Sequence, residues 1–147
     1  MIDPKRELLR HLLATVAFRG QIAVGDTPPD FATFRAAESA RTPVEILAHV
    51  GDLLYGSQYL LKGELVNLAS EPLAWDEEVL RFFNGVHEVD SFLAGDAPLA
   101  YPVEKFVQGP IGDALTHVGQ IVLLRRIAGS PVEPAAYFEA EITPGVY

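Results

Sequence analysis

The chain has 147 residues, of which 20 are acidic and 11 basic, and its formal net charge at pH 7 is −9. This length suits a single domain, which we expect to span residues 1–147. The acidity, with no basic cluster longer than a dipeptide, argues against nucleic-acid binding and against attraction to anionic membranes.

Signals for export or membrane insertion are missing from the sequence. No run approaches the roughly 18 consecutive apolar residues of a membrane span, and the opening MIDPKRELLRHLL carries charge where a signal peptide has its apolar core. The chain has no cysteine, which excludes disulfides, cysteine-bound zinc and thiolate nucleophiles. We therefore expect a cytoplasmic protein with no membrane partner.

The first predicted helix, near residues 4–22, begins at Asp3-Pro4, because aspartate is a good N-cap and proline fits the first helical position. Leucine, valine and alanine then recur at helical spacing. A long connection follows, and we expect its Phe31 and Phe34 to pack across the other helices, since such large rings are costly to leave in water.

The second predicted helix, near 43–62, has the clearest start. Thr42 and Glu45 form a capping box, in which each side chain accepts a hydrogen bond from the amide of the other residue. The third, near 76–94, opens with three acidic residues, which suit the positive end of the helix dipole, and carries an apolar stripe. Gly95 ends it.

The fourth predicted helix, near 110–128, opens at a Gly-Pro pair and ends before a Gly-Ser-Pro breaker. Four helices of about 18 residues in one small domain predict an all-α fold, a four-helix bundle. The tail of about 130–147 has too much proline and glycine for another long helix, and we expect Tyr137 and Phe138 to dock it.

Three polar residues occupy helix positions where the periodicity favours apolar side chains: His49 in the second helix, and Asp113 and His117 in the fourth. Removing such groups from water costs free energy unless a partner compensates, and a metal ion is such a partner. Asp113 and His117, four residues apart, share one helix face and can bind one ion jointly. The sequence therefore predicts a metal site completed by His49 from the other helix.

These residues also have plainer interpretations. A helical histidine often satisfies itself with a hydrogen bond inside the protein, and Asp113 near a helix start suits the dipole there. His11 and His87 receive no role. Three further polar residues, each about one turn from a predicted ligand, could orient the imidazoles or simply face solvent: Gln120, Glu45 and Asp52.

Two segments resemble the second and fourth helices of the DinB/YfiT-like superfamily of metal-dependent enzymes: RTPVEILAHVGDLLYG, with His49, and QGPIGDALTHVGQIVLLRRIAGSP, with His117. The match in order and spacing covers nearly the whole chain. The resemblance implies an up-down-down-up bundle, often dimeric, that binds a divalent ion through one histidine of the second helix and a His-x-x-x-His pair of the fourth. His49 and His117 match the first and last of these ligands, whereas Asp113 replaces the first histidine of the pair.

The replacement at Asp113 leaves two outcomes open. Aspartate is a competent ligand, so one outcome is a site of two histidines and one carboxylate for a divalent metal ion such as zinc, nickel, iron or manganese. The other is a branch of the family that has lost its metal.

An ion with three protein ligands keeps open coordination positions and can activate a water or a thiol. The resemblance implies a thiol-dependent transferase or a hydrolase acting on a small-molecule substrate, such as a low-molecular-weight thiol. Because a site built on helices needs loops or termini to exclude bulk water, we expect the docked tail to wall one side of the opening. The alternative is a non-catalytic bundle that serves as a ligand-binding or interaction protein.

We also expect a homodimer. The family is often dimeric, and the phenylalanines of the third helix, with Phe31 and Phe34, exceed what one small bundle readily conceals.

Overall fold

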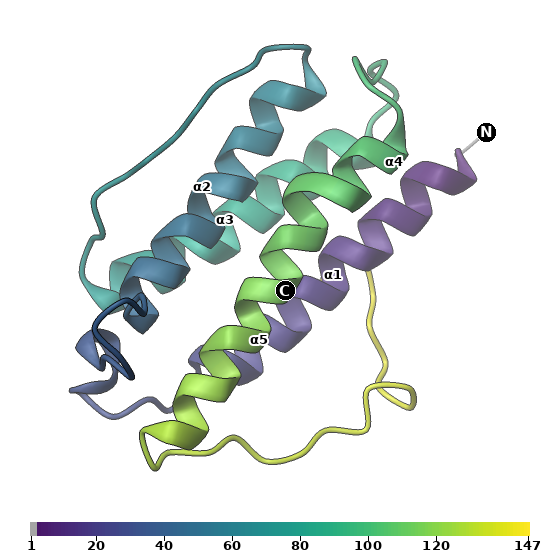
Figure 1. Cartoon of the computed structure of the whole chain (residues 1–147). Helices are drawn as coiled ribbons and strands as arrows, with labels where there is room; N and C mark the ends of the chain where they lie inside the picture. Colours follow the sequence, from purple (N-terminus) through teal and green to yellow (C-terminus); the bar gives the residue numbers. More distant parts are fainter. Residues whose placement is uncertain (1–2) are drawn as a thin grey trace.

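The computed structural model describes residues 3–147, and over these residues the fold is all-α with no β-strand (Figure 1). The four long helices are α1 (Pro4–Val24), α2 (Pro43–Leu61), α3 (Trp75–Ala94) and α5 (Gly112–Ile127), and the short segments are η1 (Phe31–Thr33), α4 (Val103–Phe106) and the π-helical η2 (Val107–Ile111). The predicted four-helix fold is confirmed, with helix ends within two residues of those predicted. None of the helices in this part of the chain is both long and apolar enough to cross a membrane.

Side-chain caps determine where α1 and α2 begin. At α1, the Asp3 carboxylate accepts a hydrogen bond from the Lys5 amide at 2.9 Å. At α2, the Thr42 amide donates to the Glu45 carboxylate at 2.7 Å, and the Glu45 amide donates to the Thr42 hydroxyl at 3.4 Å. Both predicted caps are confirmed. The capping box fixes where α2 begins, one turn before the turn that carries His49.

Each long helix packs against two others. α2 packs against α3 and α5, and α1 packs against the same two helices, so α1 and α2 lie diagonally opposite each other. The loop of residues 62–74 runs along the length of the bundle, and α3 therefore starts at the same end as α2 (Figure 1). α2 and α5, which carry the predicted ligands, are direct neighbours.

The phenylalanines that we expected to be covered by a second copy of the chain pack in the apolar core of the bundle or against it. Phe31 and Phe82 are fully buried, and Phe34 and Phe83 are partly buried and pack against the core. One bundle buries or half-buries these rings, so they do not by themselves require a second copy, and the homodimer stays a prediction.

The fourth long helix is preceded by helical structure that the sequence did not predict. Helical structure begins at Val103 and passes through the π-helical segment η2 before α5. Gly109 leaves the helical conformation, with φ −101° and ψ −114°, and Pro110 follows inside the segment. A Cβ atom at Gly112 would lie 2.3 Å from the Val107 carbonyl oxygen, so only glycine allows this close approach. The kink sets the start of α5 and the direction of its first turn.

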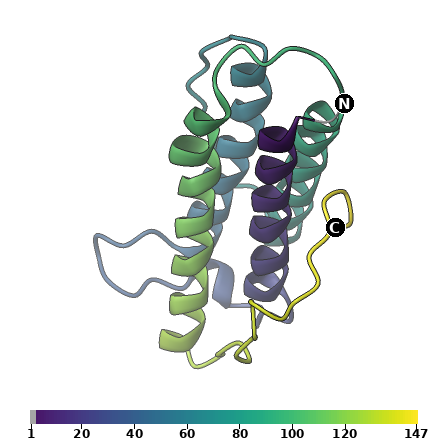
Figure 2. The ribbon, with the colours of Figure 1, turned by 90° about the vertical axis from the view of Figure 1, so that its right-hand side faces the viewer.

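The tail after α5 returns beside α1 (Figure 2). The ring of Tyr137 packs edge-on against Phe18, with ring centres 6.5 Å apart, and the Arg19 guanidinium lies 3.8 Å from its centre. Phe138, in contrast, is fully exposed. The expectation that both tail aromatics help to dock this segment is therefore wrong for Phe138.

Candidate metal centre

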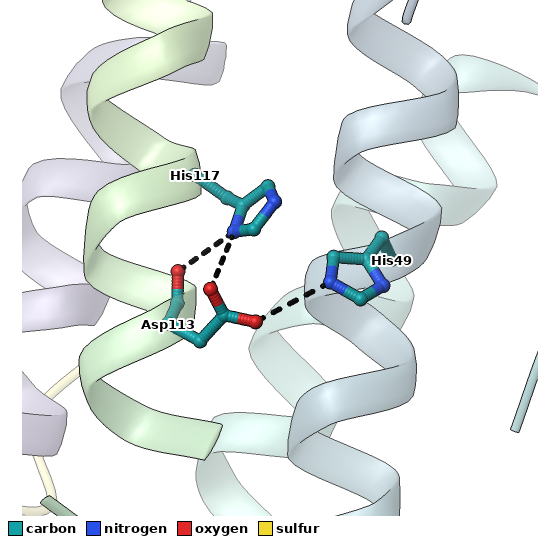
Figure 3. A group of neighbouring side chains, drawn as sticks. All are labelled: His49, Asp113 and His117. Atoms are coloured by element: carbon teal, nitrogen blue, oxygen red, sulfur yellow. Dashed lines mark hydrogen bonds and ion pairs between the residues drawn. The ribbon is translucent and has the colours of Figure 1, made fainter. Parts of the chain in front are cut away.

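The three predicted ligands meet between α2 and α5. His49 lies in the second turn of α2, Asp113 in the first turn of α5, and His117 one turn further along α5. Their side chains face one another across the space between the two helices (Figure 3). One ligand atom from each residue lies within 4.8 Å of the other two, which confirms the predicted convergence.

The Asp113 carboxylate lies between the two imidazoles. Its Oδ2 is 3.5 Å from His49 Nε2, and its Oδ1 is 3.2 Å from His117 Nδ1. The two rings pack edge to face, with their centres 4.7 Å apart. A carboxylate shared by two imidazoles can be linked to them by hydrogen bonds or by one common cation.

The ring of His117 is oriented by its own helix. Its Nδ1 lies 2.8 Å from the main-chain carbonyl oxygen of Asp113, and a carbonyl oxygen can only accept a hydrogen bond. In the neutral ring the proton is therefore on Nδ1, and Nε2 keeps its lone pair. The ring nitrogen of His117 without a dashed line in Figure 3 is Nε2, and it faces the α2 side. This tautomer is the one that binds a metal through Nε2.

The donor set and its spacing fit a divalent ion. Two imidazole nitrogens and a carboxylate oxygen are ligands that zinc and its neighbours in the first transition row accept. Ligand atoms about 2.1 Å from one tetrahedral ion lie about 3.4 Å apart, which is close to the 3.5 Å between Asp113 and His49. The three ligand atoms lie within 4.8 Å of one another, so an ion would draw the more distant ones closer.

The centre is open on one side. The exposed fraction of the side chain is 14% for His117, 32% for His49 and 45% for Asp113. His49 and Asp113 border an open cavity of about 600 Å³, whose other walls include residues 66–68 and residues 108–110. The sequence did not predict these walls, because neither a long loop nor a π-helical kink leaves a periodic signal.

Two of the residues predicted to orient the imidazoles, Glu45 and Gln120, form no hydrogen bond to either ring within residues 3–147. The Glu45 carboxylate is taken up by the capping box and lies 3.5 Å from Arg35. Gln120 is exposed and lines a hollow beside His117, with no hydrogen bond to that ring within residues 3–147.

The expectation that the tail walls the centre is also wrong, since the tail contacts α1 and α3, on the opposite side of the bundle.

Asp52, the third of these residues, fastens the loop of residues 62–74. It accepts hydrogen bonds from the Ser70 amide at 2.9 Å and the Ser70 hydroxyl at 2.7 Å, and it pairs with Arg81. Burial alone would raise the pKa of Asp52, but the bonds from Ser70 and Arg81 hold this pKa below its usual value. The fully buried Glu78 adds a second tether, because it accepts from the Leu73 amide at 3.0 Å.

Comparisons of the chain with protein-family models, with curated proteins and with solved structures found no match. The case for a function therefore depends on the residues and the geometry of the centre itself.

Proposed function

We propose that the protein is a divalent-metal-dependent enzyme acting on a small molecule, with His49, Asp113 and His117 as the metal ligands. The observation that carries this proposal is the convergence of three ligand atoms within 4.8 Å from two neighbouring helices. Zinc, nickel, iron and manganese all accept nitrogen and oxygen donors of this kind.

The chemistry that such an ion supplies when bound is Lewis acidity, which lowers the pKa of a coordinated water or thiol. Three protein ligands leave coordination positions open, as in catalytic rather than structural sites. The cavity of about 600 Å³ gives a small molecule access to His49 and Asp113. We propose two reaction classes on this basis: transfer involving a low-molecular-weight thiol, and hydrolysis.

The residues of the chain bind and orient in this proposal. The hydrogen bond from His117 Nδ1 to its own helix holds the ring with Nε2 available. Asp113 brings a negative charge that offsets part of the charge of a divalent cation. Apolar side chains around the cavity, Leu53, Leu60 and Leu68, reduce the water around a bound molecule.

The resemblance of the α2 and α5 sequences to the DinB/YfiT-like superfamily supports the proposal. The direction of the helices suits it as well, because α2 and α3 start at the same end of the bundle, as the up-down-down-up order requires (Figure 1). We therefore propose a member of that superfamily in which Asp113 replaces one histidine ligand.

One observation favours a second candidate, a non-catalytic bundle that binds a ligand or a partner without a metal. The Asp113 carboxylate already lies 3.5 Å from His49 and 3.2 Å from His117. Hydrogen bonds within the three residues can therefore compensate their partial burial without an ion.

The two candidates are separated by the metal content of protein purified without a histidine tag or a nickel column. Wild type, His117→Ala and His87→Ala are each offered zinc, nickel, iron and manganese in turn, dialysed and analysed for metals. His87 is exposed on α3 and serves as the matched control. We expect about one ion per chain for wild type and His87→Ala, and none for His117→Ala, with the helical circular dichroism unchanged in all three.

Wild-type protein that retains none of the four metals would favour the metal-free bundle. Equal metal in wild type and His117→Ala would show that the ion binds at other residues.

A further inference from the structure

An arginine borders the candidate metal centre on two sides. Arg41 stands immediately before Thr42, the N-cap of α2. It lines one hollow of about 530 Å³ together with His49, and a second hollow of about 380 Å³ together with His117. Arg41 therefore shares a hollow with each histidine, and a molecule bound at the metal could extend past either histidine toward this residue.

The Arg41 side chain has no acidic partner in the part of the chain that the structure describes. Within residues 3–147 its guanidinium has no hydrogen bond or ion pair, although Glu45 and Asp52 line the same hollow. Glu45 is engaged with the Thr42 amide and with Arg35, and Asp52 is engaged with Ser70 and Arg81. An exposed, unpaired guanidinium beside engaged carboxylates is available to a ligand.

The charge balance at the centre favours an anion. The chain as a whole is strongly acidic, at −9, so it repels anions in general. At the proposed site, a divalent cation meets one carboxylate, that of Asp113, and two neutral imidazoles, which leaves about one positive charge. Arg41 adds a second, in the two smaller hollows beside His49 and His117. The bound metal ion and Arg41 would then be two positive charges on either side of a hollow. This arrangement suits a molecule that carries two anionic groups.

We infer that the substrate of this centre is a carboxylate-bearing small molecule, whose carboxylate is bound by Arg41 while its reacting end lies at the metal. The planar guanidinium forms paired hydrogen bonds with a carboxylate, which fixes the orientation of the molecule as well as its affinity. This inference rests on the proposed function, because it takes the metal as the second point of attachment.

The test uses cobalt-loaded, tag-free protein, because the visible spectrum of cobalt reports a ligand entering its coordination sphere. Straight-chain dicarboxylates from malonate to suberate are titrated in, alongside monocarboxylates of the same chain lengths. Arg41→Gln is compared with wild type and with Arg126→Gln, which removes the same charge from an exposed position on α5 that lines none of the hollows around the centre. Dicarboxylates with one end replaced by phosphonate tell whether the guanidinium prefers a phosphate group.

We expect one chain length to bind wild type at least about tenfold more tightly than its monocarboxylate, a difference of about 1.4 kcal/mol. Arg41→Gln should remove this preference and leave monocarboxylate binding unchanged, while Arg126→Gln should resemble wild type. Cobalt binding with no preference for dicarboxylates, or with equal losses in both variants, overturns the inference and leaves the metal proposal intact. A preference for the phosphonates over the dicarboxylates also overturns the carboxylate assignment. Failure of wild type to bind cobalt overturns both.

Discussion

The hydrogen bond between His117 Nδ1 and the Asp113 carbonyl oxygen, at 2.8 Å, determines which nitrogen of the ring can bind a metal. Sequence reasoning found the three ligands because each is a polar residue on a helix stripe that is otherwise apolar. It proposed side chains as the orienting groups and missed the carbonyl, because a main-chain atom has no signature in the sequence. It also missed Arg41, which precedes the helix and so belongs to no periodic pattern.

The first prediction concerns this tautomer. In metal-free protein, the neutral ring of His117 should carry its proton on Nδ1, whereas exposed His87 should favour the other tautomer, as free histidine does. Two-bond ¹H–¹⁵N correlation spectra of protein labelled at histidine distinguish the two forms. A His117 pattern with the proton on Nε2 would mean that the carbonyl does not orient the ring.

At the scale of the elements, the sequence predicted the helices with side-chain caps best, since Asp3 and the Thr42–Glu45 box are local signals. The start of α5 was less predictable. Helical structure passes through Gly109 and Pro110, where local rules predict only a helix boundary. The path of the loop of residues 62–74 depends on Asp52 and Glu78, which are distant tethers that periodicity does not reveal.

The second prediction tests the kink before Asp113. Gly112→Ala should destabilise the fold by about 1–3 kcal/mol and weaken metal retention, because its Cβ would lie 2.3 Å from the Val107 carbonyl oxygen. Gly119→Ala is the control, since a Cβ there meets nothing within 4 Å, and it should stabilise the helix by about 0.5–1 kcal/mol. Urea unfolding and metal analysis measure both effects. Equal behaviour of the two variants would show that the close approach at Gly112 is unimportant.

The third prediction concerns the tether from Asp52. Asp52→Asn should cost about 1–3 kcal/mol at pH 7, because Ser70 and Arg81 lose a charged acceptor. The folded-state pKa of Asp52 is lowered, so the carboxylate stabilises the fold above its usual pKa of 3.8 and loses this effect as the pH falls through the folded-state value. The difference in free energy of unfolding between wild type and Asp52→Asn should therefore disappear below about pH 3.8.

Urea unfolding at several pH values measures this gap, with exposed Asp96→Asn as the control. A gap that stays constant into acid would exclude the ionised carboxylate as the source of the stability.

At the scale of the whole molecule, the all-α bundle followed from four amphipathic patterns, but the association state did not. The bundle buries or half-buries the phenylalanines on which we based the homodimer. Other large apolar side chains remain exposed on the helices: Leu8 on α1, Leu80 on α3, and Leu123 and Ile127 on α5.

The fourth prediction retains the homodimer on that different ground. Exposed apolar side chains on helix faces favour association. Multi-angle light scattering at micromolar concentration should give twice the 16.0 kDa of the chain, and Leu123→Glu should lower the value toward one chain. A mass near 16.0 kDa for wild type would show that these side chains do not pair two copies.

The central claim is that His49, Asp113 and His117 bind one metal ion, and anomalous diffraction tests it most directly. A crystal of tag-free protein grown with zinc is measured on both sides of the zinc absorption edge. We predict one anomalous peak between α2 and α5, about 2.0–2.2 Å from His49 Nε2, an Asp113 carboxylate oxygen and His117 Nε2. The absence of a peak at these three residues, or zinc bound only by others, would contradict the account.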